Sequence, residues 1–406
     1  MNINLIKPRQ NRNAVGNTNT GFVACLACLA LFILIFSSAC SDKEATKRSP
    51  LKGLGDTTGA FEKPARSNVI EFPAAHAPQK SYQQEWWYLT ANLTTESGEA
   101  LATQWTLFRR GVESKHWYFA HAALADAQHH QSAFRSARAE LGNLTINNKV
   151  TEAKPFNAKI DDWQWQSSKG LLPANLHYGN FGNIEAEDQA STDAIKGGLK
   201  DKQLWQVNLN LTLAESSSAN PKENYFLQGD NGYSQKHHSL AIASHYYSQP
   251  FIKVSGEVYW QNKWQKVTGN AWFDREWGSQ MLAEDQQGWD WFSLRLNEQT
   301  ALMVYRIRSI EKDYLYGSLM QRDGTIHTLS SEDIVIKSRF SNQSVANAEY
   351  PDSFAIEIAQ EEIDITVKVI NKSQIMRFGI EYFEGMVSFS GSHQGQGFLE
   401  MTGYDK

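Results

Sequence analysis

Cysteine is nearly absent from this chain of 406 residues: all three cysteines, Cys25, Cys28 and Cys40, lie within its first 40 positions. The body that follows has no thiol, which excludes internal disulfides, cysteine nucleophiles and zinc–thiolate sites there. Cys25 and Cys28 have the spacing of a redox pair, but they lie in an apolar N-terminal run where such chemistry has no role.

An excess of positive charge is lacking as well. The chain has 39 Lys and Arg against 44 Asp and Glu, a formal net charge of -5, so nucleic acid is not expected as a partner. Neither a Walker pattern nor a Gly-x-Ser-x-Gly elbow occurs, which leaves nucleotide and serine-hydrolase chemistry without support.

The first 39 residues have the three parts of an export signal. Basic residues precede an uncharged, mostly apolar run at 22–36, and small residues lead from it to Cys40. The run is shorter than the roughly 20 residues that span a bilayer as a helix, so a cleaved signal is favoured over a permanent anchor helix.

The residues before Cys40 are similar to a bacterial lipobox, although Ser37 stands where Leu is usual. The resemblance implies that Cys40 is acylated and begins the mature chain, and two acyl chains suffice for stable membrane anchoring. Ser41 implies sorting to the outer membrane of the cell envelope, facing the periplasm. A secreted or periplasmic form is the alternative.

The domain organisation follows from composition and length. Residues 40–67 are polar and without periodicity, which predicts a flexible tether. A boundary near Pro250 predicts an N-terminal domain at 68–250 and a C-terminal domain at 251–406, each of ordinary size.

Period-two alternation dominates the chain beyond residue 68. At 85–93, Trp87 and Leu89 share one face of a strand, and Trp86 and Tyr88 share the other. Similar stretches occur at 101–109, 205–213, 251–260, 269–277, 289–296, 302–308, 354–358, 363–369 and 382–389. Without apolar helices between them, these stretches predict an all-β fold of antiparallel barrels or sandwiches with sparse helix. Polar segments at 185–203 and 215–224 are interpreted as surface loops.

One segment echoes another. Residues 86–93 can be laid over 289–296, and each is followed by a returning strand that ends in an aromatic residue and an arginine, Arg109 or Arg306. A duplication explains the echo, and so does chance in an aromatic-rich β protein.

The segment 269–278 is the strongest candidate for chemistry. On a strand, Trp272, Asp274 and Glu276 point to one side and Arg275 to the other. Burial and a neighbouring like charge raise the pKa of a carboxyl group, which makes a candidate general acid. The alternative is that these carboxylates are exposed or ion-paired with an arginine.

Two histidines, His121 and His245, lie beside aromatic residues. Such a histidine is more often a hydrogen-bonded structural group than a base. Both could join Asp274 and Glu276 as metal ligands, but no fixed ligand spacing occurs near them, so no metal site is predicted.

A series of motifs runs in order from about residue 68 to 404. They include Glu85-Trp86-Trp87-Tyr88, Ala120-His121-Ala122, Ser244-His245-Tyr246-Tyr247-Ser248, Asp274-Arg275-Glu276-Trp277-Gly278, Gly288-Trp289-Asp290-Trp291-Phe292 and Tyr382-Phe383-Glu384-Gly385. The series resembles the carotenoid 1,2-hydratase-like family, which includes AttH-type lipocalin-like secreted proteins. The resemblance implies two lipocalin-like antiparallel β-barrel domains with ligand space around them.

For function, the resemblance implies acid-initiated hydration of a C=C bond in an isoprenoid, with no organic cofactor. It matches Asp274 to the proton donor, and Glu276 or His245 is expected to position water; the acid is expected to point into a hollow of the second barrel. The expected ligand-binding residues are Trp86, Trp87, Tyr88, Arg109, His121, Tyr246, Tyr247, Trp272, Trp289 and Trp291. Many relatives have His where this chain has Arg275, and an ion pair from it would lower the pKa of the acid.

Three functions stay open. The first is a hydratase that acts on a hydrophobic, isoprenoid- or lipid-like small molecule. The second is a non-catalytic, lipid-anchored carrier of such a molecule that serves an export system of the ABC transporter type. Export of the chain favours the carrier, because carotenoid biosynthesis occurs at the cytoplasmic side. The third, a hydrolase of unknown substrate, lacks a recognisable nucleophile–base pair.

Overall fold

The computed structural model describes residues 61–138, 142–181, 204–214, 225–340, 350–378 and 380–404. The predicted export signal, the lipidation site Cys40, most of the tether and both predicted loops lie outside the described residues. Within them the structure is nearly all β, with two 3-10 helices, Ala74–His76 and Ala359–Glu361, and no α-helix. No helix in these ranges is long and apolar enough to cross a membrane.

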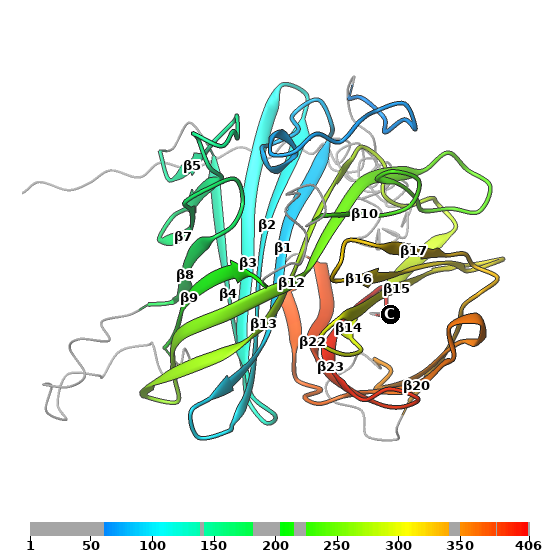
Figure 1. Ribbon diagram of the computed structural model, residues 1–406. Helices are drawn as coiled ribbons and strands as arrows, with labels where there is room; N and C mark the ends of the chain where they lie inside the picture. The colour runs from blue at the N-terminus through cyan, green and yellow to red at the C-terminus, as the bar shows by residue number, and fades with distance from the viewer. Residues whose placement is uncertain are drawn as a thin grey trace, which may run out of the picture. The chain divides into compact units, whose positions relative to one another are not determined.

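Among the described residues, 13 strands form the first sheet, which is shown in Figure 1. They are β1 (Gln84–Thr95), β2 (Ala100–Val112), β3 (Lys115–Ala125), β4 (His130–Arg138), β5 (Leu144–Ile146), β6 (Asn157–Ile160), β7 (Trp163–Ser167), β8 (Ala174–Asn180), β9 (Trp205–Leu213), β10 (Phe226–Leu227), β11 (Tyr233–Gln235), β12 (Ala243–Trp260) and β13 (Lys263–Gly278). Their order is β4-β3-β2-β1-β13-β12-β9-β8-β7-β6-β5, and β10 and β11 pair with β12. Because β4 also lies against β6 and β8, the sheet forms a nearly closed barrel.

In the described part of the chain, the second sheet has 10 strands and forms a half-barrel. They are β14 (Gln286–Arg295), β15 (Thr300–Ser309), β16 (Tyr314–Gln321), β17 (Ile326–Leu329), β18 (Val335–Arg339), β19 (Ser353–Ile358), β20 (Ile363–Val369), β21 (Ile375–Phe378), β22 (Ile380–Gly391) and β23 (Gly395–Thr402). Their order is β17-β16-β15-β14-β23-β22-β20-β19-β18, and β21 pairs with β22. The predicted all-β fold of two lipocalin-like antiparallel barrels is confirmed.

Both sheets follow one connection scheme. In each, the first four strands form a meander, and the first strand then pairs with the last, β1 with β13 and β14 with β23. This shared order is what a duplication predicts. Position 250 lies inside β12, and the chain passes to the second sheet between Gly278 and Gln286. The domain limits at 250 and 251 stay a prediction.

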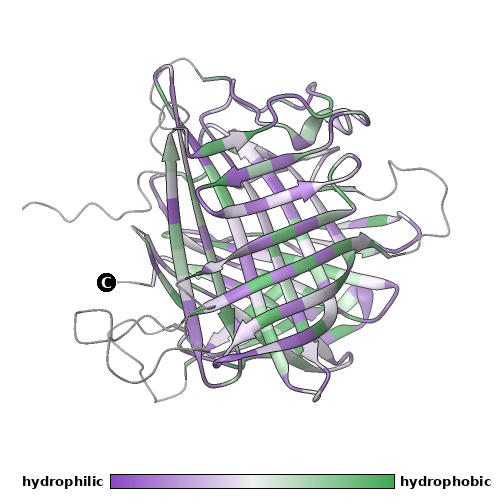
Figure 2. Cartoon of the chain, turned by 90° about the vertical axis from the view of Figure 1, so that its left-hand side faces the viewer, coloured by the Kyte–Doolittle hydropathy of each residue, from purple (hydrophilic) through white to green (hydrophobic). Residues whose placement is uncertain are grey.

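Alternation along the strands sorts side chains into three cores, and Figure 2 shows the matching change of hydropathy from residue to residue. On β1, Trp87 and Leu89 belong to the core inside the first barrel. The second barrel is filled by side chains that include Phe292, Leu294, Ile356, Ile365, Val367 and Leu399. A third core lies between the two sheets and includes Tyr88, Tyr246, Trp272, Trp291, Met303 and Tyr305. Burial of this apolar surface, at about 25 cal/mol per Å², holds the sheets together.

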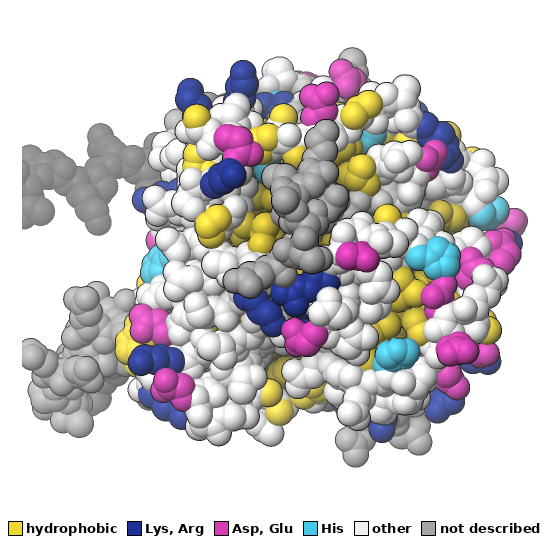
Figure 3. All heavy atoms as spheres, in the orientation of Figure 1, with side chains coloured by type: hydrophobic (Ala, Val, Ile, Leu, Met, Phe, Trp, Pro, Cys, Tyr) yellow, Lys and Arg dark blue, Asp and Glu magenta, His cyan; other side chains and the backbone are white. Residues whose placement is uncertain are grey.

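Charged side chains of both signs are intermixed on the face shown in Figure 3. Exposed ion pairs such as Arg66–Asp230, at 2.6 Å, and Lys253–Glu298, at 3.1 Å, join neighbouring charges at the surface. Such pairs contribute about 0–1 kcal/mol each, so the buried cores provide most of the stability.

Candidate functional site

A cavity of about 370 Å³ lies between the two sheets. The first sheet contributes outward residues of β1, β2, β3, β12 and β13, and the second contributes residues of β14, β15, β21, β22 and β23. Most of the wall is apolar and includes Trp86, Phe108, Phe119, Leu282, Trp289, Trp291, Ile307 and Phe378. The prediction of a hollow inside the second barrel is wrong. The interior of that barrel is packed with side chains, and Asp274 belongs to β13 of the first sheet.

Asp274 is a buried acid in this wall, only 2 % exposed. Its Oδ1 accepts hydrogen bonds from Ser248 Oγ at 2.5 Å and Trp272 Nε1 at 3.0 Å. Its Oδ2 accepts one from the Tyr246 hydroxyl at 3.0 Å. Burial raises the pKa of Asp274 to about 7, although these three hydrogen bonds lower it. Near neutral pH the group therefore exists in both protonation states and can both give and accept a proton.

Glu276 lies on the same face of β13 and also lines the cavity. Lys236 Nζ is 2.8 Å from its carboxylate, and the Ser244 hydroxyl donates to the same oxygen. The Lys236 ammonium also lies 5.0 Å from the centroid of the Tyr246 ring and 4.7 Å from that of Tyr305. Glu276 is thus a fixed polar group with a cation beside it.

Residues 245–247 of β12 point in alternate directions. Tyr246 faces the cavity, whereas His245 and Tyr247 face the interior of the first barrel. There His245 Nε2 lies 3.2 Å from Asn68 Oδ1, and burial lowers its pKa to about 4, so the ring is neutral. The Tyr247 hydroxyl lies 2.6 Å from Nδ1 of His76. The assignments of His245 to water and of Tyr247 to the ligand are therefore corrected: neither residue lines the cavity.

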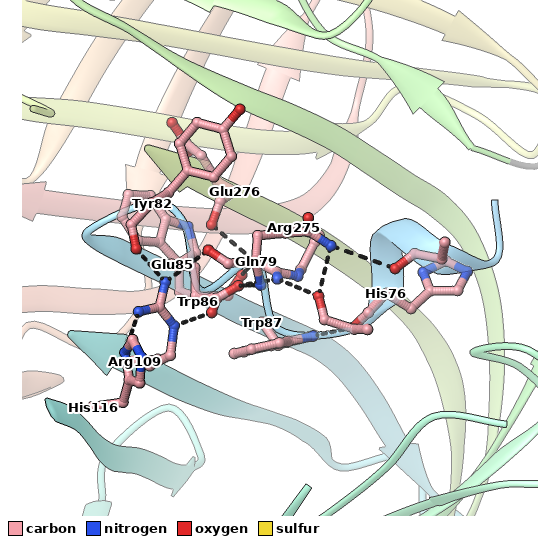
Figure 4. Close-up of polar contacts among 12 residues, drawn as sticks. His76, Gln79, Tyr82, Glu85, Trp86, Trp87, Arg109, His116, Arg275 and Glu276 are labelled. Atoms are coloured by element: carbon pink, nitrogen blue, oxygen red, sulfur yellow. Dashed lines mark hydrogen bonds and ion pairs between the residues drawn. The ribbon is translucent and has the colours of Figure 1, made fainter. Parts of the chain in front are cut away.

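Trp87 also belongs to the core inside the first barrel, and Figure 4 shows Arg275 beside it. The Arg275 guanidinium stacks 3.8 Å from the Trp87 ring centroid, and Trp87 Nε1 donates to the His76 carbonyl at 2.9 Å. Trp87 is thus corrected from a ligand residue to a core residue. Arg275 is ion-paired with Glu85 and not with Asp274. Having arginine here, where many relatives have histidine, therefore does not lower the pKa of Asp274.

Glu85 holds a second guanidinium, that of Arg109 on β2 (Figure 4). Burial by itself raises the pKa of Glu85, but the two arginines and a backbone hydrogen bond outweigh it, and the pKa is lowered overall. Arg109 also donates to the carbonyls of Gln79 and Tyr82. Although Arg109 borders the cavity, its charged group is engaged in holding the end of the first barrel.

The structure brings most of the predicted residues to the cavity. Those in its wall are Trp86, Tyr88, Arg109, His121, Tyr246, Asp274, Glu276, Trp289 and Trp291. Trp272 does not line the cavity but donates to Asp274. His121 pairs through Nδ1 with the Tyr382 hydroxyl at 2.7 Å, and burial lowers its pKa to about 3, so it is neutral. Within the described ranges, no three His, Cys, Asp or Glu side chains form a group that could hold a metal ion.

Two acids in the wall were missed from the sequence, Glu384 on β22 and Glu400 on β23. They are direct cross-strand partners. Burial raises the pKa of Glu384 to about 8, although the nearby Tyr88 and Tyr382 hydroxyls lower it. Burial and then the charge of Glu384 raise the pKa of Glu400 well above its usual range. Alternation with Tyr382 could have placed Glu384 on an outward face, but nothing in the sequence indicates that this face meets Asp274.

Comparison with known proteins places this geometry in a family. A model described as AttH-like matches residues 63–404. The crystal structure of a putative AttH (NE1406) from Nitrosomonas europaea is 26 % identical, covers 85 % of this chain and 100 % of its own, and superposes with a TM-score of 0.69. Kievitone hydratase from Nectria haematococca shares the fold at 12 % identity, covering 86 % of this chain and 98 % of its own, with a TM-score of 0.57. No curated protein matches the chain.

Proposed function

Because the chain belongs to the AttH-like family, we propose that it binds a hydrophobic, isoprenoid- or lipid-like molecule between its two sheets and hydrates a C=C bond of that molecule. One observation carries the proposal: Asp274 is an acid buried in an aromatic-walled cavity of about 370 Å³. That volume lies within the range of small-molecule sites. The similarity in fold to kievitone hydratase is consistent with such a reaction.

The proposed reaction begins with neutral Asp274. Its proton forms a C–H bond with the π electrons of the double bond, which leaves a tertiary carbocation and the Asp274 carboxylate. The ring faces of Trp86 and Trp291 in the cavity wall stabilise the cation. The oxygen of a water molecule, held beside Glu276 and Lys236, then bonds to the cation, and the proton it loses returns to Asp274. A pKa near neutrality suits both steps, so no organic cofactor is required.

The export signal and Cys40 favour a second candidate. If Cys40 is acylated, the body is held at the outer membrane, and the same cavity would serve a non-catalytic carrier that passes an apolar molecule to an ABC-type export system. A hydrolase of unknown substrate is the least supported reading, because no Ser or Cys is among the described residues that line the cavity.

An isotope experiment separates the candidates. The purified protein is incubated with β-farnesene, an isoprenoid with a trisubstituted terminal double bond, in water enriched in oxygen-18, and products are analysed by mass spectrometry. The hydratase proposal predicts a labelled tertiary alcohol from the wild type, and a loss of at least about 100-fold in Asp274→Asn with binding retained. His245→Gln, on the other face of β12, is the matched control and should keep the activity. Bound but unreacted farnesene in the wild type would instead support the carrier.

A further inference from the structure

Three buried side chains in the cavity wall have hydrogen-bonding atoms without a partner among the described residues. These atoms are the Tyr88 hydroxyl, His121 Nε2 and both carboxyl oxygens of Glu384; the Tyr88 and Tyr382 hydroxyls lie close enough to the Glu384 carboxyl to shift its pKa, but they do not form well-aligned hydrogen bonds with it. The side chains are 5, 3 and 1 % exposed, respectively. A buried polar atom that lacks a partner destabilises a fold, and folded proteins contain few of them. Several such atoms around one cavity indicate that a polar group binds there.

Tyr88 and His121 are both linked to Glu384. Tyr382 connects His121 to Glu384, because its hydroxyl bonds to His121 Nδ1 and also lowers the pKa of Glu384. Tyr88 lies next to Glu384 from the first sheet, and burial, followed by the charge of Glu384, raises the pKa of Tyr88 well above its usual value. Residues from both sheets thus form one polar patch, consisting of Tyr88, His121, Tyr382, Glu384 and Glu400, within an otherwise apolar wall.

The polar patch favours a neutral group. Glu384 and Glu400 face each other across neighbouring strands, where Cβ atoms are about 4.5–5.5 Å apart and two charges repel. Burial keeps both carboxyls protonated at neutral pH. The charges of Glu276 and Asp274 act on Glu400 as well, so an anionic ligand group would be repelled. An ammonium group would lose its hydration without gaining a carboxylate partner within the patch, because Glu384 and Glu400 are protonated.

A hydroxyl fits these partners best. It can accept a hydrogen bond from a protonated carboxyl or from Tyr88, and it can donate one to a carboxyl oxygen or to an imidazole nitrogen. We infer that the preferred ligand carries a neutral hydroxyl group bound by Glu384, Tyr88 and His121, so that an oxygenated lipid binds more tightly than the corresponding hydrocarbon. This inference rests on the proposed function, because it assumes that an apolar ligand occupies the cavity.

Matched C15 probes test the inference. Quenching of tryptophan fluorescence, with Trp86, Trp289 and Trp291 in the wall, reports the binding of farnesene, farnesol, farnesoic acid and farnesylamine. Farnesol should bind the wild type about tenfold more tightly than farnesene, the equivalent of one additional buried hydrogen bond. Farnesoic acid and farnesylamine should bind more weakly than farnesol.

Variants assign the preference to residues. Glu384→Met should weaken farnesol binding about tenfold and leave farnesene binding equal or tighter, since the unpaired carboxyl is gone. His121→Phe tests the same preference without altering the acid pair, should Glu384→Met fail to fold. Glu381→Gln, on the same strand but ion-paired with Arg377 near the surface, is the matched control and should keep the preference.

The outcomes are distinguishable. Equal affinities of farnesol and farnesene for the wild type would overturn the hydroxyl inference and leave apolar binding intact. Tighter binding of farnesylamine or farnesoic acid than of farnesol would overturn the inference that the bound polar group is neutral. If neither farnesene nor farnesol binds, the proposed function fails, and the inference fails with it.

Discussion

Tyr88 on β1 and Asp274 on β13 are direct cross-strand partners, and both side chains line the cavity. Ser248 on β12 is the partner of Asp274 on the other side and donates to it at 2.5 Å. The acid is therefore held between two neighbouring strands and does not depend on a loop for its position. Sites on strands hold their geometry closely, which suits a group that must meet one carbon atom of a substrate.

Tyr246→Phe should raise the pKa of Asp274 above its value of about 7, because the lost hydrogen bond favours the charged carboxylate. We expect the pKa of Asp274 to rise by about 1, which is equivalent to about 1.4 kcal/mol. Infrared titration of the carboxyl stretch measures this pKa, and Asp274→Asn assigns the band. Tyr247→Phe is the control, since that hydroxyl faces His76 inside the barrel and should leave the band unchanged. A Tyr246→Phe protein that titrates like the wild type would contradict the assigned role of this hydrogen bond.

Stability should decrease as pH rises through neutrality. The folded-state pKa values of Asp274 and Glu384 are raised to about 7 and about 8, so between the unfolded and folded values the native state binds more protons than the unfolded chain. Unfolding then releases protons, and each group lowers the free energy of unfolding by up to about 1.4 kcal/mol per pH unit in that window. Urea unfolding between about pH 7 and pH 8 measures the slope, because at lower pH the buried histidines His121 and His245, whose pKa values are lowered, change stability in the opposite direction.

Glu384→Gln should flatten that slope, because the amide does not titrate. Glu381→Gln on the same strand should retain the wild-type slope. A wild-type stability that rises across this window would show that the cavity acids are ionised in the folded protein.

Glu85→Gln should destabilise the fold by about 3–5 kcal/mol, since it leaves the guanidiniums of Arg109 and Arg275 buried without their carboxylate. Chemical denaturation monitored by circular dichroism gives the loss. The second sheet offers a parallel case in Asp290, which is fully buried and 2.7 Å from Arg306. Asp290→Asn should also destabilise strongly, and a loss below about 1 kcal/mol in both variants would place these pairs among weak surface interactions.

If Cys40 is acylated as proposed, Cys40→Ser should release the protein from the membrane. Without the thiol no acyl chain can be attached, and the proposed anchoring by two chains would be lost. Fractionation of the envelope, with metabolic labelling by a fatty acid, should move the protein from the membrane to the soluble fraction and abolish the label. Wild-type protein that is already soluble and unlabelled would favour the secreted or periplasmic form.

The fold could be predicted because its information is local. Alternation over about eight residues marks a strand and its two faces, and the same rule correctly separated Arg275 from Asp274 and Glu276. Applied to residues 245–247, the same rule places His245 and Tyr247 on one face of β12 and Tyr246 on the other, so the three residues do not form one cluster. Glu384 and Glu400 could not be predicted as site residues. They come close to Asp274 only because one sheet packs on the other, and the sequence carries no local signal for that packing.

Most side chains in the cavity wall face outward from the barrels, whereas both barrels are filled by inward-facing side chains. Along the same strands, one set of alternate residues therefore determines which ligand binds, and the other set forms the stabilising interiors of the two barrels. Substitutions at one set can change which molecule is held without opening a void in either barrel, so a single scaffold of this kind is free to diversify in chemistry at little cost in folding.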